Sequence, residues 1–276
     1  MTLPAQTLDL RYGAANIPMP TISTAEIDRM LAHRSVRGYR PDPLPEGMLE
    51  TLVAVAQSAA TSSNLQTWSV VAITDTAMKA TYAAMAGGQK HIEQCPVFLL
   101  FVADLARLNR VADKVEIAHL GNDTFEMFLC AAIDASLAAQ NAVVAAESLG
   151  LSTVYIGGMR NKPEELAALL NLPPSSAVVF GLCVGYAAEG HEGSVKPRLP
   201  QEAVLHYEHY DLARQDEAIE RYNAAMATFY ERERMDVKGN WSRHSAKRVA
   251  GPESLSGRQV LMQALRRMGF FKAEQV

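Results

Sequence analysis

The chain has 276 residues, of which 49% are hydrophobic and 20% charged, and its formal net charge is −4. This length and balance are ordinary for a soluble globular protein with a full hydrophobic core. Proteins that bind nucleic acids usually carry a clear basic excess, so the slightly acidic balance argues against that class.

The predicted elements are helices with a few short strands between them. Residues 1–22 contain three prolines and little periodicity, which predicts an N-terminal arm. A capping box, Ser23-x-x-Glu26, predicts a short helix that ends near residue 32. Further helices are predicted over residues 46–59, 75–86, 123–149, 162–172, 210–234 and 255–268, and strands over residues 67–74, 95–104, 151–158 and 176–187. This pattern indicates an α+β or α/β protein with one central sheet. No segment has the composition of a domain linker, so residues 23–276 are predicted to form a single domain.

One segment, residues 127–146, is apolar and long enough to span a membrane. Asp134, Ser136, Gln140 and Asn141 interrupt it, and an isolated carboxylate at that depth in a bilayer is costly. We therefore predict a helix that is buried in a protein core or a subunit interface, without membrane association.

The cysteines and the N-terminal sequence indicate a reduced, cytoplasmic protein. Cys95, Cys130 and Cys183 lie far apart in apolar runs and form neither a Cys-x-x-Cys pair nor a zinc-binding spacing. We therefore expect buried reduced thiols and no metal site. The first residues lack the basic and apolar segments of a secretory signal, and we expect the protein in the cytoplasm.

The motifs of several common mechanisms are missing. No G-x-G-x-x-G follows a strand, no G-x-x-x-x-G-K-[ST] occurs, and the seven histidines form no H-E-x-x-H. The sequence GLCVG at residues 181–185 resembles a nucleophile elbow around Cys183, but the apolar run continues through it to Tyr186. A buried strand fits this run better than the sharp turn that an elbow needs. A Ser/His/Asp triad stays open, although nothing in the sequence points to one.

Four polar loops remain, and each has groups that suit an anionic ligand. They cover residues 33–40, 61–66, 87–91 and 193–198. The basic side chains in them can neutralise a phosphate dianion: Arg34, Arg37, Lys196 and Arg198. The amides of Asn64 and Gln66 can both donate and accept along the edge of a flat heterocycle. For each loop alone, a turn with solvated side chains is an alternative, and basic residues at a helix end can simply complement its dipole.

Six motifs occur in a fixed order along the chain, and together they resemble a known family. They are HRSVRGY, SAATSSNLQTW, GGQKH, AAESLGLSTVYIGGMRN, FGLCVGY and KPRLP. From about residue 23 to residue 241, the chain resembles the FMN-dependent nitroreductase superfamily. Within it, the resemblance is to the branch of oxygen-insensitive NADPH nitroreductases and NADPH-flavin oxidoreductases. It implies an α+β, nitroreductase-like fold with a central mixed or antiparallel sheet wrapped by helices. It also implies an intertwined homodimer with two FMN sites at the interface, in which the helix over residues 123–149 is buried.

The resemblance also implies which residues contact FMN. The five segments that it assigns are His33, Arg34, Ser35 and Arg37; Ser62, Ser63, Asn64 and Gln66; Gln89, Lys90 and His91; Tyr155, Ile156, Gly157 and Gly158 along the isoalloxazine; and Lys196 and Arg198 at the phosphate. The second segment reads Thr-Trp after Gln66 where Pro-Trp is common in the superfamily, so either of Ser62 and Ser63 can be the flavin contact.

The implied activity needs no catalytic side chain, because the chemistry takes place on FMN N5. Two electrons pass by ping-pong from NADPH or NADH through FMN to a small-molecule acceptor such as a nitroaromatic or a quinone. Arg37 or Lys90 can supply positive charge beside the reduced flavin. Arg232, Arg234 and Lys238 are candidates for the 2′-phosphate of NADPH, although a solvated charged face explains them equally well. The alternatives are a flavin reductase that supplies reduced FMN to a partner, a flavin-binding protein without turnover, and a dehalogenase-like or dehydrogenase-like specialist.

Overall fold

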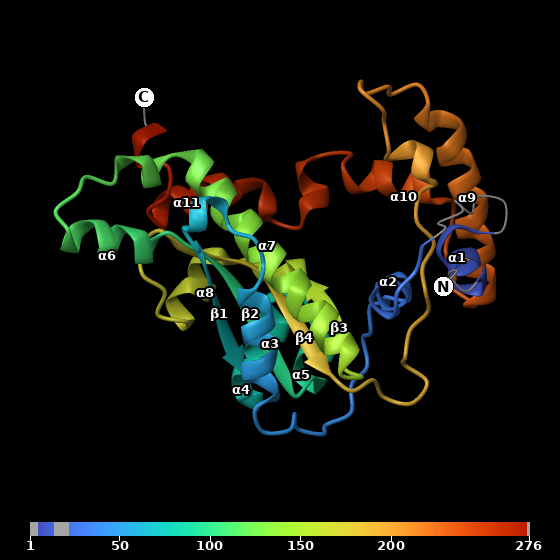
Figure 1. The fold of residues 1–276 in the computed structure, drawn as a ribbon, viewed down its shortest axis with the longest axis horizontal. Helices are drawn as coiled ribbons and strands as arrows, with labels where there is room; N and C mark the ends of the chain where they lie inside the picture. Colours follow the sequence, from blue (N-terminus) through green and yellow to red (C-terminus); the bar gives the residue numbers. More distant parts are fainter. Residues whose placement is uncertain (1–4, 14–21, 275–276) are drawn as a thin grey trace. The chain divides into compact units, whose positions relative to one another are not determined.

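The computed structural model describes residues 5–13 and 22–274 of the chain (Figure 1). The chain divides into two compact units. Unit 1 is made of residues 1–34 and 193–255, and unit 2 of residues 35–192 and 256–276. A single domain over residues 23–276 stays a prediction.

Within the described residues, unit 2 contains one antiparallel sheet of four strands in the order β1–β2–β4–β3. The strands are β1 (Trp68–Ile73), β2 (Val97–Asp104), β3 (Ser152–Ile156) and β4 (Ser176–Gly185). Each of them lies inside a range that the sequence predicts as a strand. Leu99 of β2 pairs with Ala72 on one side and with Leu182 on the other, so β2 is an interior strand. Its continuous apolar run follows from this position, because both of its faces are covered.

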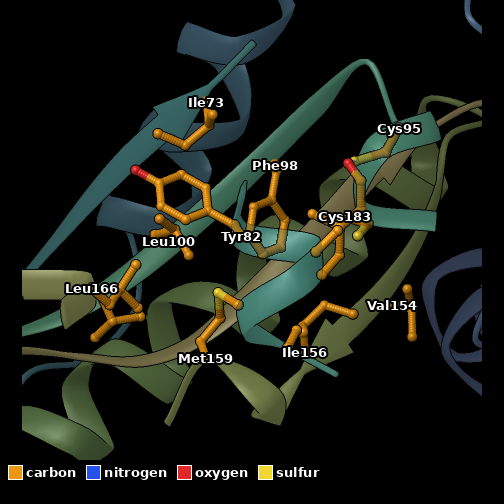
Figure 2. Packing of buried hydrophobic residues seen from close by; sticks show 14 of the residues in the cluster. Ile73, Tyr82, Cys95, Phe98, Leu100, Val154, Ile156, Met159, Leu166 and Cys183 are labelled. Atoms are coloured by element: carbon orange, nitrogen blue, oxygen red, sulfur yellow. The ribbon is translucent and has the colours of Figure 1, made fainter. Parts of the chain in front are cut away.

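The helices of unit 2 are α3 (Met48–Gln57), α4 (Thr76–Met85), α5 (Lys90–Gln94), α6 (Ala106–Lys114), α7 (Phe125–Ser148), α8 (Pro163–Leu169) and α11 (Leu261–Arg267). The side chains of β2 point alternately to the two faces of the sheet. The helices cover a separate cluster of buried residues on each face. Phe98 and Leu100 pack with residues of α4, α5 and α8, and Figure 2 shows Tyr82 of α4 beside them. Leu99 and Phe101 pack on the other face with α3 and α7.

Helix α7 has 24 residues, and small side chains dominate its buried face. Ala131, Ala135, Ala138 and Ala142 are among the buried residues, and this allows α7 to lie close to the sheet. Within the described residues it is the one helix that is long and apolar enough to cross a membrane, and its buried face makes it a core helix of unit 2.

The helices of unit 1 are α1 (Ala5–Tyr12), α2 (Ala25–Leu31), α9 (Gln215–Arg232) and α10 (Trp241–Arg248). Tyr222, Met226 and Phe229 of α9 form the buried centre of this unit. The rings of Tyr222 and Trp241 meet edge to face with their centroids 5.2 Å apart, which fixes α10 against α9.

The sequence does not predict helices α1, α6 and α10. Helix α1 lies within the predicted arm over residues 1–22, of which residues 1–4 and 14–21 lie outside the described part of the chain. The capping box at Ser23 is wrong by one residue. Thr24 is the N-cap of α2 and accepts a hydrogen bond from the Ile27 N–H at 3.3 Å, whereas the Ser23 hydroxyl donates to Asp28.

Candidate functional site

The first predicted segment is divided between the two units: His33 and Arg34 belong to unit 1, and Ser35 and Arg37 to unit 2. In unit 2 this segment runs beside β3, since Ser35 forms a parallel bridge with Thr153 and the Val36 N–H donates to Thr153 O at 3.0 Å. Val36 is buried, whereas Ser35 and Arg37 are exposed. This is the alternation that extended backbone imposes.

The second predicted segment has a backbone that few side chains adopt. Ser63, Asn64 and Gln66 have φ values of 49°, 56° and 52°, in the left-handed region. For residues other than glycine this conformation costs roughly 1–2 kcal/mol each. Such strain persists only where the surroundings determine the conformation, and it clusters at ligand-binding loops.

The buried carboxylate of Asp134, in α7, is the group that holds this loop. Its Oδ1 accepts a hydrogen bond from the Ser62 N–H at 3.1 Å. Its Oδ2 accepts from Thr61 Oγ1 at 2.5 Å, from Thr67 Oγ1 at 2.9 Å and from the Thr67 N–H at 3.2 Å. Thr61 Oγ1 in turn accepts from the Gln66 N–H at 2.9 Å, which closes the loop on itself. Sequence reasoning treated Asp134 as an interruption of an apolar helix and missed this role.

The third predicted segment lies against the glycine pair. Gln89 Nε2 donates to Ala86 O at 2.8 Å. A Cβ atom at Gly158 would lie 2.9 Å from Ala86 O and 3.0 Å from Gln89 Nε2. Only glycine fits such a close approach, so unit 2 brings Gln89 and Gly158 together.

His91, in the same segment, has a polar atom without a partner. Its Nε2 is buried, and no described residue forms a hydrogen bond with it. Burial lowers the pKa of His91, and the positive charge of Arg37 lowers it further. The ring is therefore neutral near pH 7 and has one nitrogen that can donate or accept. Arg37 and His91 thus lie near enough to interact electrostatically.

Tyr155 and Ile156 precede the glycines and point to opposite faces of the sheet. The Tyr155 ring meets Phe180 edge to face at 5.2 Å, and its hydroxyl donates to Gln140 Oε1 of α7 at 3.4 Å. Ile156 is buried in the cluster that contains Tyr82. Their side chains therefore cannot both line one ligand, and the backbone of this segment is the part that the two share.

Two guanidinium groups lie beside Gly157, and sequence reasoning missed both. A Cβ atom at Gly157 would lie 3.3 Å from Arg160 Nη2 and 3.6 Å from Arg258 Nη1. Burial lowers the pKa of Arg160, and the charge of Arg258 contributes. The motif GGMR places Arg160 near the glycines, whereas no sequence signal connects Arg258 with them.

In unit 1 the buried guanidinium of Arg11 joins the segments that carry the other predicted residues. It donates to Leu31 O at 2.6 and 3.1 Å, to His33 O at 2.8 Å and to Lys196 O at 2.8 Å. The Arg198 N–H donates back to Arg11 O at 2.7 Å. Unit 1 therefore brings the backbone of His33 next to the backbone of residues 196–198.

The basic side chains of unit 1 are exposed around this buried guanidinium. Arg34, Lys196 and Arg198 all present accessible side chains. Lys196 Nζ lies 5.8 Å from the centre of the Phe229 ring. Tyr222 fixes the chain between Lys196 and Arg198, because its hydroxyl donates to Pro197 O at 3.1 Å. The result is a cationic surface of unit 1 that suits an anion.

Cys183 is not a nucleophile. Strand β4 runs through it without a turn, and a Cβ atom at Gly181 would lie 2.3 Å from the Phe98 ring. Burial raises the pKa of the Cys183 thiol.

Cys95 is also a buried free thiol, but the prediction of a buried thiol is wrong for Cys130. Cys130 is half-exposed because it lies at the edge of the buried face of α7. The described residues hold no group of three or more His, Cys, Asp or Glu that could bind a metal ion.

The chain is similar to known proteins over most of its length. It matches the model of the nitroreductase family over residues 30–186, and that of the nitroreductase family C-terminal domain over residues 196–273. A Cr(VI) reductase of Pseudomonas sp. (strain G-1) is 40% identical over 215 residues, which are 78% of this chain and 87% of the relative. The oxygen-insensitive NADPH nitroreductase of Salmonella typhimurium is 37% identical over 219 residues, which are 79% of this chain and 88% of the relative.

A solved structure supports the same grouping. The NADPH:FMN oxidoreductase of Vibrio harveyi, in complex with NAD+, is similar with a TM-score of 0.78 and 33% identity. The match covers 90% of this chain and 100% of the other. The α+β fold expected from the sequence motifs is therefore confirmed, with an antiparallel sheet.

Proposed function

The chain belongs to the nitroreductase family, and from this premise we propose that it passes two electrons by ping-pong from NAD(P)H to nitroaromatics, quinones or similar acceptors. It is an oxidoreductase with FMN as cofactor and NAD(P)H as electron donor, of the branch that includes oxygen-insensitive NADPH nitroreductases and NADPH-flavin oxidoreductases. Bound FMN supplies the two-electron chemistry, and the protein supplies binding, orientation and electrostatics.

The observation that carries this proposal is the strained loop of Ser62–Asn64 and Gln66, held by Asp134. Strain at three residues and a four-bond carboxylate anchor are features of a built binding site rather than of a surface turn. The loop presents two side-chain amides and two hydroxyls, which match the alternating donors and acceptors of an isoalloxazine edge.

The groups on the glycine side of unit 2 also fit a flavin ring. At Gly158 a Cβ atom would collide with Ala86 O, and at Gly157 it would lie close to two guanidinium groups, so the backbone of both glycines approaches neighbouring groups closely. His91 Nε2 is a buried polar atom that still needs a hydrogen-bond partner. A ligand with polar edges satisfies such an atom, whereas an apolar ligand leaves its desolvation uncompensated.

We assign the ring to these residues and the phosphate to the basic side chains. In unit 1, Arg34, Lys196 and Arg198 supply the positive charge that a phosphate dianion requires. Arg37 lies within electrostatic range of His91, and either Arg37 or Lys90 can supply the charge that stabilises the reduced ring. Arg160 and Arg258 add positive charge beside Gly157.

The phosphate assignment predicts the effect of removing two of these arginines. Replacing Arg34 and Arg198 together with alanine lowers FMN affinity by about 3–6 kcal/mol, because each charged hydrogen bond contributes roughly 1.5–3 kcal/mol. The measurement is FMN binding by quenching of flavin fluorescence. Arg40→Ala is the matched control, because Arg40 is exposed and pairs with Asp42 at 3.1 Å. FMN affinity that is unchanged in the double variant would contradict the assignment.

The donor preference and the assembly belong to the same proposal. Arg232 donates to Glu233 Oε1 at 2.9 Å and lies 5.3 Å from the centre of the Phe229 ring, so Arg234 and Lys238 are the more available cations for a 2′-phosphate. An exposed apolar stripe on α7 supports a homodimer; it consists of Phe125, Leu129, Ile133 and Leu137. A cytoplasmic location and a small-molecule acceptor complete the proposal.

Initial-rate kinetics under air test the activity. Parallel lines in double-reciprocal plots with NADPH or NADH and a nitroaromatic are expected for a ping-pong oxidoreductase. If turnover requires excess free FMN and stops without it, the flavin-reductase alternative is correct. If the protein binds FMN but oxidises no NAD(P)H, the alternative of a flavin-binding protein without turnover is correct.

A further inference from the structure

We propose that Arg11 is a positioning residue that sets the phosphate-binding surface of unit 1, and that helix α1 is an N-terminal addition that carries it. The inference rests on the proposed function, because it concerns the same FMN phosphate. Arg11 lies outside the region matched by the family model, which begins at residue 30. The residues that it holds, His33 and Lys196, lie inside the regions matched by the two family models.

The contacts of Arg11 connect three stretches of backbone. Its guanidinium donates to the carbonyl oxygens of Leu31, His33 and Lys196, at distances from 2.6 to 3.1 Å. Lys196 is 185 residues away along the chain. The side chain is 6% exposed, so these bonds form away from bulk water. The Arg11 side chain therefore links the segment that contains Leu31 and His33 with the segment that contains Lys196.

The geometry requires arginine. A guanidinium presents five N–H donors in a fixed planar fork and stays charged when buried. Nε and Nη2 both reach Leu31 O, Nη2 also reaches His33 O, and Nη1 reaches Lys196 O. A lysine ammonium is a point charge on a flexible stem, and it cannot bridge the carbonyls from one position in the same way.

Further contacts on both sides of Arg11 hold helix α1 in unit 1. Leu8 is buried, and the Arg198 N–H donates to Arg11 O at 2.7 Å. Gly13 ends the helix with φ of 79°, and a Cβ atom there would lie 3.3 Å from Ala225 Cβ of α9. Arg11 is thus fixed by the fold of unit 1 rather than by its own side chain alone.

We expect the arrangement held by Arg11 to affect the binding of the phosphate group and not of the rest of the ligand. Arg34 follows His33 directly, and the Arg198 N–H donates to Arg11 O, so the positions of both basic side chains depend on this arrangement. The buried charge of Arg11 also raises the positive potential of the same surface. A ligand without a phosphate does not use either effect.

Binding of FMN and of riboflavin, which lacks the phosphate, tests the inference. In Arg11→Lys, FMN affinity is expected to fall on the order of tenfold or more while riboflavin affinity changes less than about twofold, because charged hydrogen bonds to the phosphate are lost. The exposed Arg214→Lys, at the start of α9, is the matched control and leaves both affinities unchanged. Equal losses for FMN and riboflavin, or no loss for either, would overturn the positioning role.

Thermal unfolding and a second variant distinguish a loss of positioning from a loss of folding. Thermal unfolding of the variant shows whether unit 1 is folded, and if Arg11→Lys does not fold, Leu8→Ala loosens α1 with Arg11 intact. That variant is expected to show the same selective loss of FMN affinity, in a weaker form, and equal FMN affinity would overturn the proposal. If the wild-type protein binds riboflavin and FMN equally or binds neither, the phosphate assignment or the proposed function fails instead.

Discussion

At the scale of single residues, the carboxylate of Asp134 determines the shape of the strained loop. Its two oxygens accept from two different backbone N–H groups, Ser62 to Oδ1 and Thr67 to Oδ2. An asparagine has only one such oxygen, so its NH₂ group would face one of these donors. A carboxylate is therefore the group that this position requires, and the sequence could not reveal it because the partners lie 67 to 73 residues away.

Asp134→Asn is expected to lower the affinities for FMN and riboflavin together, by about tenfold, because a buried N–H left without a partner costs about 1–3 kcal/mol. Fluorescence titration with both flavins measures this effect. Thr61→Val should act in the same direction and Thr61→Ser should restore binding, because Ser keeps the hydroxyl that joins Gln66 to Asp134. Asp123→Asn, a buried carboxylate that lies 3.8 Å from Lys272, serves as the control. Unchanged flavin binding in Asp134→Asn would show that the loop does not contact flavin.

His91 gives a pH dependence of stability with a definite sign. Its pKa is lowered from 6.5 in the folded protein, chiefly by burial, so the folded state binds a proton less readily than the unfolded chain. Stability is therefore lost as the pH falls below about 6.5, and it is unaffected by this group above that range. In flavin-free protein, the melting temperature of the wild type should drop more between about pH 7.5 and pH 5.5 than that of His91→Gln. Identical drops would mean that His91 titrates normally.

At the scale of elements, helix α7 presents two different faces. Its buried face packs alanines against the sheet. On its other side Phe125, Leu129, Ile133 and Leu137, four residues apart, form a stripe whose members are 42%, 42%, 48% and 44% exposed. This spacing places them on one side of the helix. Contiguous exposed apolar side chains mark an interaction surface, and the proposed homodimer would place a second copy of the chain on it.

Ile133→Asp is expected to weaken the proposed dimer, because a charge in the centre of an apolar interface remains desolvated and unpaired. Sedimentation or light scattering at decreasing protein concentration measures the change. Leu169→Asp places the same charge at an exposed leucine of α8 and is the control. A variant that stays dimeric at the same concentrations as the wild type would exclude this stripe as the interface.

The elements also show what a single sequence can predict. All four strands and the long helix follow from apolar runs and the turn residues that bound them, which are local signals. Helix α1 is short and polar, and Arg11 in it is bonded to Leu31 and to Lys196, which are distant along the chain. No local pattern therefore predicts this helix. Helix α6 has only 9 residues, is rich in polar side chains and has no buried residue, so no apolar run marks it in the sequence.

At the scale of the whole molecule, the candidate site depends on segments distant in sequence. The motifs predict these segments, because HRSVRGY and KPRLP occur in a fixed order with the others. They could not identify the residues that hold the segments in place, such as Arg11 in unit 1 and Asp134 in unit 2. Arg11 acts on backbone carbonyls, and Asp134 acts on two backbone N–H groups and two threonine hydroxyls. Their partners are brought near only by the fold.

The absorbance of the bound flavin tests the central claim most directly. The purified protein, reconstituted with FMN if necessary and kept free of oxygen, is mixed first with NADPH or NADH and then with a nitroaromatic or a quinone. The visible flavin band should bleach after the donor and return after the acceptor, with one equivalent of each consumed per bound FMN. A protein that cannot be loaded with FMN, or whose bound flavin keeps its full absorbance after the donor is added, would contradict the account.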